Sequence, residues 1–203
     1  MVVRTYNIVR VLGDGSCFYR SLFNAAFGKS ANLPRRILRK VWMDSSLQFD
    51  IQERNSEDNF VLMLRRGIAL RMVKHKDYNV VSGMHQRIRE YDDDVLDSIF
   101  ESYPSWFVRN YRKQGKRMTL NQFRNALAKD ITEKHHWAFE LDVWIITSIL
   151  EKELKMRLGV FYHRPPNDFK FRKNTLYVIN EHETHYNAVV PKLTGQFTFY
   201  RSC

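Results

Sequence analysis

Two segments of the chain hold residue types that can carry nucleophilic catalysis, and the first surrounds Cys17. It runs Gly13-Asp14-Gly15-Ser16-Cys17 and passes directly into an apolar pattern with helical spacing. A thiol at the start of a helix lies at the positive end of the helix dipole, which favours the thiolate over the thiol. Backbone N–H groups at a helix start lack intrahelical acceptors, so they can donate to an oxyanion beside the sulfur. The alternative is a small buried cysteine that begins an amphipathic helix.

The second segment contains His185 and Asn187, far along the chain. A cysteine nucleophile needs a base, and the base needs a group that orients it. Residues two apart on a strand share one face, so His185 and Asn187 are predicted to point the same way. Asn187 would then accept from one imidazole nitrogen while the other nitrogen faces Cys17. The alternative for His185 is a surface histidine at the end of a hairpin.

The remaining histidines do not indicate a metal site. His182 and His185 are three residues apart instead of the four of a zincin helix, and strand-like sequence follows them. His135 and His136 form an adjacent pair that is expected to diverge on a helix. We therefore expect no metal ion and no other cofactor.

Helical patterns come first along the chain, and strand-like patterns come last, which predicts an α/β protein of the α+β type. The expected helices are one that starts at Cys17 and stops at Gly28, several across 33–103, one capped by Thr119 and Gln122, and one across 139–154. The expected strands are rich in β-branched and aromatic residues and span 156–162, 175–179, 185–190 and 196–200, with a loop across 164–174. They predict a small antiparallel sheet.

Composition narrows the class of protein further. The chain has 203 residues, a formal net charge of +11 and only two cysteines, so we expect one domain across 1–203 in a reducing compartment, with Cys17 as a free thiol. No apolar run is long enough to span a membrane. The basic residues are scattered and follow no nucleic-acid-binding motif, so we interpret them as a solvated surface and do not expect nucleic acid as a partner.

Three motifs resemble those of the ovarian tumour (OTU) family of cysteine proteases. The sequence Asp-Gly-Ser-Cys-Phe-Tyr-Arg-Ser at 14–21 looks like the family's nucleophile motif, and His-Tyr-Asn-Ala-Val at 185–189 resembles its histidine motif. The segment Trp-Ala-Phe-Glu-Leu at 137–141 is similar to a helix start that lies between the two, with a shorter Trp-to-Glu spacing. Together these matches extend across 12–191.

The resemblance implies an OTU-like fold, with a small, mostly antiparallel sheet packed between helices, and a thiol-dependent deubiquitinase. By this carry-over Cys17 is the nucleophile, His185 the general base and Asn187 the group that orients it. Asp14 would shape the oxyanion loop, which the backbone N–H groups of residues 14–17, including Gly15 and Ser16, would complete. The reaction would hydrolyse the isopeptide bond at the C-terminal Gly of ubiquitin through a thioester.

The partner implied is ubiquitin or a polyubiquitin chain, in the cytoplasm, or in the host cytoplasm if the protein is a viral or bacterial effector. The acids Asp92, Asp93 and Asp94 could contact the basic tail of ubiquitin, or they could form a solvated helix face. Trp137 could line the approach to His185, or it could be a core residue. The loop 164–174 is expected near His185, where it would influence which chains are cut.

Two alternatives to a deubiquitinase remain. The same fold could cut another ubiquitin-like modifier or a polyprotein junction, using the same catalytic residues. A non-catalytic basic binding module is the third hypothesis, although its sequence would be expected to lack Cys17, His185 or Asn187, and all three are present.

Overall fold

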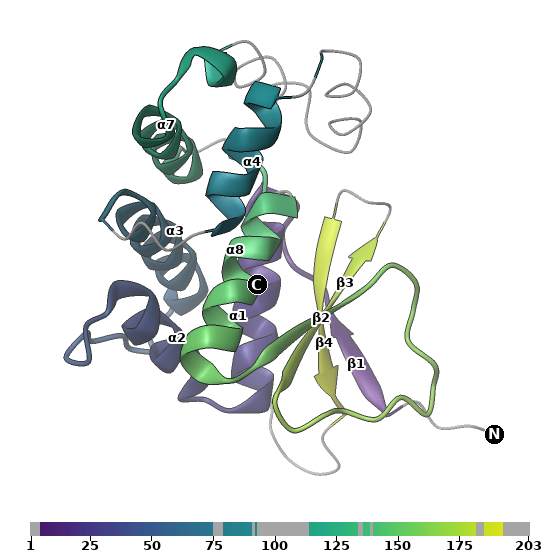
Figure 1. Ribbon diagram of the computed structural model, residues 1–203. Helices are drawn as coiled ribbons and strands as arrows, with labels where there is room; N and C mark the ends of the chain where they lie inside the picture. Colours follow the sequence, from purple (N-terminus) through teal and green to yellow (C-terminus); the bar gives the residue numbers. More distant parts are fainter. Residues whose placement is uncertain are drawn as a thin grey trace.

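The computed structural model describes residues 5–74, 79–90, 92, 114–133, 136–138, 140–181 and 185–192. Their arrangement is mixed α/β, which confirms the predicted fold class at that level (Figure 1). The elements in chain order are β1 (Tyr6–Val9), α1 (Cys17–Lys29), α2 (Leu33–Trp42), α3 (Ser56–Lys74), α4 (Asn79–Glu90), α7 (Leu120–Thr132), α8 (Glu140–Leu154), β2 (Arg157–Phe161), β3 (Thr175–Glu181) and β4 (His185–Pro191).

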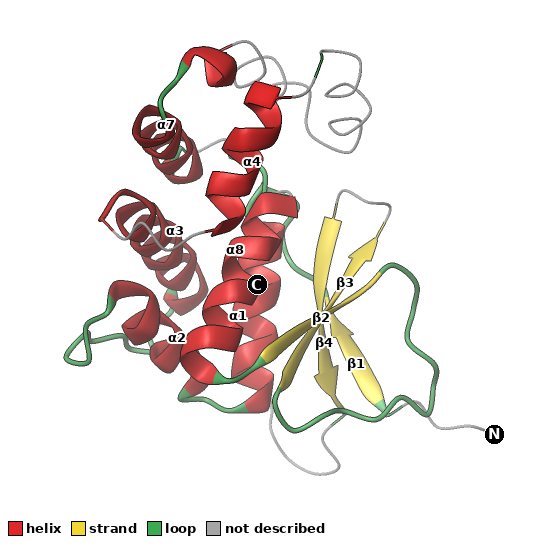
Figure 2. Ribbon diagram, viewed as in Figure 1, coloured by secondary structure: helices red, strands yellow, loops and turns green. Residues whose placement is uncertain are grey.

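The described strands form one sheet in the order β1-β4-β3-β2 (Figure 2). β4 pairs antiparallel with both β1 and β3, whereas β2 runs parallel to β3, so the prediction of a mostly antiparallel sheet is confirmed. Three predicted strands correspond to β2, β3 and β4, and the fourth, at 196–200, lies outside the described residues. β1 was not predicted as a strand, because only its second half falls within the short apolar stretch that precedes Gly13.

The two faces of the sheet are covered differently. Tyr186, Ala188 and Val190 alternate along β4 into the main core, which contains side chains from every described helix. Val189 faces the other way, into a smaller cluster that the aromatic side chains of the connection 162–174 complete. In the described part of the chain, the helices therefore lie against one face only (Figure 1), and the prediction of a sheet packed between helices is wrong.

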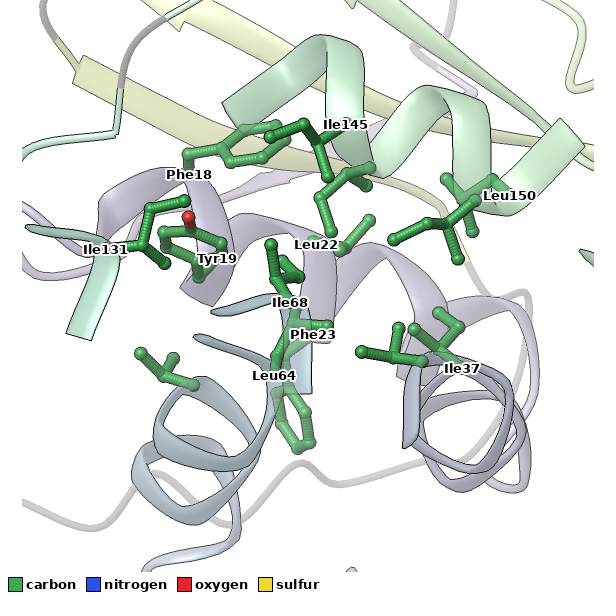
Figure 3. Close-up of a cluster of buried hydrophobic side chains, with 14 of the residues drawn as sticks. Phe18, Tyr19, Leu22, Phe23, Ile37, Leu64, Ile68, Ile131, Ile145 and Leu150 are labelled. Carbon is green, nitrogen blue, oxygen red and sulfur yellow. The ribbon is translucent and has the colours of Figure 1, made fainter. Parts of the chain in front are cut away.

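Helix α1 is the central element of the core. It packs against β3 and β4 on one side and against α2 and α3 on the other. Figure 3 shows its side chains between those of α8, such as Ile145 and Leu150, and those of α2 and α3, such as Ile37 and Leu64. Helix α1 begins at Cys17 as predicted, and every residue of its first two turns is buried, the polar ones included. The first residue of the central helix is thus the proposed nucleophile.

Gly28 does not stop α1, as the sequence predicted, but lies within it. A Cβ on Gly28 would be 2.8 Å from Cγ1 of Val190, so the glycine permits the helix to approach β4 closely. The helix ends one residue later, where the N–H of Ser30 donates to the carbonyl oxygen of Ala26. Glycine is therefore required here by packing and not by a turn.

The predicted capping box at the start of α7 is confirmed. The N–H of Gln122 donates to the Thr119 hydroxyl at 3.3 Å, and the Gln122 side chain accepts from the Thr119 N–H at 2.8 Å. Among the described residues, no helix combines the length and the apolar character needed to cross a bilayer.

Candidate active site

The sulfur of Cys17 is buried where the N-terminus of α1 meets the start of β4. Cys17 is 2% exposed, and the backbone N–H groups of Tyr186, Phe18 and Cys17 itself lie near enough to its sulfur to lower its pKa. Tyr186 directly follows His185, so the fold joins the two segments that the sequence singled out. Backbone donors of this kind stabilise negative charge, on the sulfur or on an oxygen bound beside it.

The thiol by itself is not activated. Burial raises the pKa of Cys17, and the nearby Asp14 carboxylate also raises it, while the three backbone N–H groups act in the opposite direction. The prediction that this placement favours the thiolate is therefore wrong for the isolated thiol, since loss of solvent outweighs the helix start. A thiolate here needs a partner that accepts the proton and keeps the resulting positive charge close.

His185, the partner that the sequence predicts, lies beside the loop that leads to Cys17. It is the first residue of β4 and is half-buried. Its ring lies against Gly13, with Nδ1 3.7 Å and Cε1 3.8 Å from the position that a Cβ on Gly13 would occupy. A larger residue at Gly13 would touch the imidazole, so the glycine leaves the ring room beside the loop that leads to Cys17.

Asn187 makes hydrogen bonds other than the one expected. It is 1% exposed and shares a face of β4 with His185, as the strand prediction required. Its Oδ1 accepts from the N–H of Val11 at 3.1 Å, and its Nδ2 donates to Oε2 of Glu181 at 2.9 Å. These bonds tie the segment before the Cys17 loop to the sheet, while the orientation of His185 by Asn187 stays a prediction.

Asp14 organises the loop before Cys17. Its Oδ1 accepts from the N–H of Ser16 at 3.1 Å, and its carboxylate receives Nε and Nη2 of Arg20, the latter at 2.6 Å. Burial alone would raise the pKa of Asp14, but the Arg20 guanidinium and the Ser16 N–H lower it. The Ser16 N–H is thus committed to Asp14, which corrects the expectation that it completes an oxyanion hole.

Arg20 was missed by the sequence analysis although it lies within the nucleophile motif. Its Nη1 donates to Glu57 at 2.9 Å and to Asp58 at 2.6 Å, both in the first turn of α3. Because the same guanidinium also holds Asp14, it links α3 to the loop that precedes Cys17. The sequence feature that could have identified Arg20 is its place one turn into a mostly apolar helix. An arginine buried there needs a partner for its charge.

Gly15 and Trp137 form the other side of this loop. Gly15 has φ +79°, and a Cβ there would lie 3.0 Å from the carbonyl oxygen of His136 and 3.3 Å from the Trp137 ring. The Gly15 carbonyl accepts from the N–H of Ala138 at 3.1 Å, which fixes 136–138 against the loop. Trp137 is 44% exposed, so it is a surface residue beside the loop and not a core tryptophan.

Behind the loop lies a buried ionic cluster that the sequence did not predict. The side chain of His136 is fully buried, with Nδ1 3.0 Å from Asp130 and Nε2 2.9 Å from Asp142. Burial alone would lower the pKa of His136, but Asp142 and Asp130 raise it to about 9. Asp142 also accepts from the Tyr19 hydroxyl. His136 lies between α7 and α8 and not on a helix, which corrects the sequence expectation.

Arg65 joins this cluster to the loop. Its Nη1 donates to the Ser16 hydroxyl at 3.1 Å, its Nε to the carbonyl oxygen of Ile131 at 2.6 Å and its Nη2 to that of Glu133. Its guanidinium carbon lies 5.9 Å from the centre of the Tyr19 ring. The Ser16 side chain is therefore held from within the core, which makes its role structural.

Two segments were predicted to contact the substrate, the acids at 92–94 and the loop 164–174. Asp92 is exposed just beyond α4, whereas Asp93 and Asp94 lie outside the described residues. The loop 164–174 contacts Thr5 and Tyr6, which lie at the end of the sheet opposite His185. Its expected position near His185 is therefore wrong, since the chain runs back along the sheet to enter β3 parallel to β2.

Within the described ranges, no group of three His, Cys, Asp or Glu side chains is arranged to hold a metal ion. A comparison of the chain with protein-family models found no matching model, and a comparison with curated proteins found no match. The chemistry of the site thus rests on its own geometry and on the resemblance of its motifs.

Proposed function

We propose that this protein is a cysteine-dependent deubiquitinase that hydrolyses the isopeptide bond at the C-terminal Gly of ubiquitin. One observation supports the hydrolase chemistry most directly. The backbone N–H of Tyr186, next to His185, lies near enough to the Cys17 sulfur to lower its pKa, and the His185 ring lies against Gly13 in the loop that leads to Cys17. These contacts support the proposal because they bring the loop before Cys17 and the start of β4, two distant parts of the chain, next to each other. Ubiquitin as the substrate rests on the resemblance of the motifs.

The proposed reaction has two steps, the formation of a thioester on Cys17 and its hydrolysis. His185 takes the proton of the Cys17 thiol, and the thiolate attacks the carbonyl carbon of the terminal glycine. The C–N bond to the lysine amine breaks, the amine leaves with the proton from His185, and a thioester remains on Cys17. Water then attacks the thioester and gives its proton to His185, which returns it to the departing sulfur. The balance needs no oxidant, metal or cofactor.

Backbone groups can stabilise the oxyanion in both steps. The N–H groups of Cys17 and Phe18 already lie near the sulfur, so an oxygen bound beside the sulfur lies within their reach. Ser16 is excluded as a backbone donor by its bond to Asp14. Asp14 therefore acts by fixing the loop, with Arg20 holding its carboxylate in place.

The surface beside the loop offers two apolar side chains to an extended tail. Leu12 is 66% exposed and directly precedes Gly13, while Trp137 packs on Gly15 with its ring partly open to solvent. These two side chains flank the loop and offer apolar contacts to residues that precede a terminal glycine. We place the reaction in the cytoplasm, because Cys17 is a free thiol and its chemistry requires reducing conditions.

Cleavage of di-ubiquitins of different linkage tests the proposal. We expect the wild type to cleave at least one linkage, Cys17→Ala to cleave none, and Cys203→Ala, which changes the chain's other cysteine, to behave as the wild type. A ubiquitin probe with an electrophilic C-terminus should label Cys17 alone. Probes of other ubiquitin-like modifiers in parallel distinguish the alternative substrates. A folded wild type that ignores every ubiquitin substrate and probe would contradict the proposal.

A further inference from the structure

A carboxylate on the neighbouring strand shares a face of the sheet with His185, the base of the proposed reaction. Glu181 is the last residue of β3, and its Cα is paired with that of His185 in the register of β3 and β4. Paired residues of antiparallel strands project from the same face, with Cβ atoms about 4.5–5.5 Å apart. Glu181, His185 and Asn187 therefore share one corner of the sheet.

The hydrogen bonds of Asn187 show which groups its side chain contacts at this corner of the sheet. Its amide oxygen accepts from Val11, and its amide nitrogen donates to Oε2 of Glu181. The side chain that the sequence proposed for orienting His185 thus holds a carboxylate instead, from the strand opposite. An imidazolium is oriented more strongly by a charged acceptor than by an amide oxygen that is already bound to a backbone N–H.

We propose that Glu181 positions the His185 imidazole during catalysis, and that the hydrogen bond from Asn187 holds the Glu181 carboxylate in place. The nitrogen of His185 that faces the loop remains available to Cys17, and the carboxylate stabilises the positive charge that His185 carries after it takes the thiol proton. Glu181 touches neither substrate nor sulfur, so its role is positioning. This inference rests on the proposed function, because it takes Cys17 as the nucleophile and His185 as the base. It does not depend on ubiquitin being the substrate.

Glu181→Gln tests the charge and leaves the shape unchanged, because the new amide oxygen can still accept from Asn187. On a ubiquitin substrate with a fluorescent leaving group, we expect a kcat about ten-fold lower with KM unchanged, the size of one interaction between opposite charges at short range. Glu181→Asp keeps the charge and should retain more activity than Glu181→Gln. The matched control is Glu153→Gln, which removes the negative charge of the carboxylate paired with Arg71, near the end of α8 away from the site, and should leave kcat unchanged.

A second readout separates this inference from the choice of substrate. The rate at which iodoacetamide modifies Cys17, followed by mass spectrometry from pH 5 to 9, reports the reactive thiolate without ubiquitin. We expect Glu181→Gln and His185→Gln to lower that rate at pH 6, and Glu153→Gln to leave it unchanged. If the wild type ignored ubiquitin but this pattern held, the proposed substrate would fail and the role of Glu181 would stand.

Two outcomes would overturn the role of Glu181. One is a Glu181→Gln protein that matches the wild type in kcat and in alkylation, while His185→Gln loses both. The other is a loss of activity that tracks a fall of the melting temperature to the assay range, because that would make Glu181 structural. Glu181 is only half-buried, so we expect Glu181→Gln to fold.

Discussion

His136 and His185 lie on opposite sides of the same short loop and are held in contrasting ways. His136 is fully buried, with a carboxylate on each ring nitrogen, and its carbonyl packs on Gly15. His185 is half-buried at the start of a strand, with its ring against Gly13. One histidine is fixed between two carboxylates, and the other is partly open to solvent.

The contrast explains how the loop can be both firm and reactive. A base must accept a proton during each turnover, which an imidazole between two aspartates resists because it already carries one. A buried imidazolium with two partners instead stabilises the segment that contacts the loop. In the proposed mechanism, burial therefore separates the supporting histidine from the one that transfers the proton.

The largest expected effect comes from the reactive side. His185→Gln should lower kcat for ubiquitin cleavage about a thousand-fold or more, because the thiol loses its base. The melting temperature should stay within a few degrees of that of the wild type, since His185 is only half-buried. Steady-state kinetics with thermal unfolding checks both. A His185→Gln protein that retains activity would remove His185 from the mechanism.

The supporting side should respond in stability instead. His136→Gln leaves Asp130 and Asp142 buried without a cation, which we expect to lower the free energy of unfolding by about 3–5 kcal/mol. Urea unfolding measures this change, with the exposed His163→Gln as the control. If His136→Gln left stability unchanged but abolished turnover, the assignment of the two histidines would be reversed.

The pH dependence of stability should carry the signature of His136. Its folded pKa of about 9 lies above the ordinary value of 6.5, so its contribution is complete below about pH 6.5 and is lost as pH rises through about 9. The loss should be about 3 kcal/mol at most, from a shift of this size. Urea unfolding from pH 6 to 10 checks it, and the decline should be smaller in His136→Gln. A profile identical in both proteins would argue against a charged His136.

The two glycines of the loop offer a sharper comparison. Gly15→Ala places a Cβ 3.0 Å from the His136 carbonyl at a positive φ, so we expect a loss of about 2 kcal/mol in stability. Gly13→Ala meets His185 only at 3.7 Å, an ordinary contact, and should cost less stability while slowing turnover. Equal stability losses would mean that the loop is strained uniformly. Unfolding and kinetics on both variants provide the measurement.

The smallest expected effect lies outside both histidine sites. Thr119→Ala breaks the capping box of α7, which carries Asp130 near its other end, and should lower stability by about 1 kcal/mol. Turnover at temperatures well below unfolding should not change. A fall in kcat would show that the supporting side and the reactive side are not independent.

Local patterns allowed much of the framework to be predicted. Apolar spacing and a glycine-rich turn placed the start of a helix at Cys17, and Thr119 with Gln122 marked the start of α7 correctly. Strand propensity located β2, β3 and β4. These features depend on neighbours within a few residues, which is why the sequence predicts them well.

The errors involve contacts between distant parts of the chain. The bond between Val11 and Asn187 joins residues 176 positions apart, so nothing near Asn187 indicates it. Gly28 resembles a helix stop until Val190 is placed beside it. In the sequence, nothing distinguishes His136 from its neighbour His135. Only the fold places Asp130 and Asp142 on its two ring nitrogens. The tertiary structure, and not the local pattern, decides each of these roles.

The pairing of Cys17 with the start of β4 has a consequence during synthesis. A nascent chain emerges from the ribosome with α1 first, and the strand that carries His185 follows only after all of the intervening helices. Contacts so distant in sequence form late in folding. In the proposed mechanism, the nascent polypeptide therefore has the Cys17 thiol without its base, and it becomes able to cleave a conjugate only once its last described strand has joined the sheet.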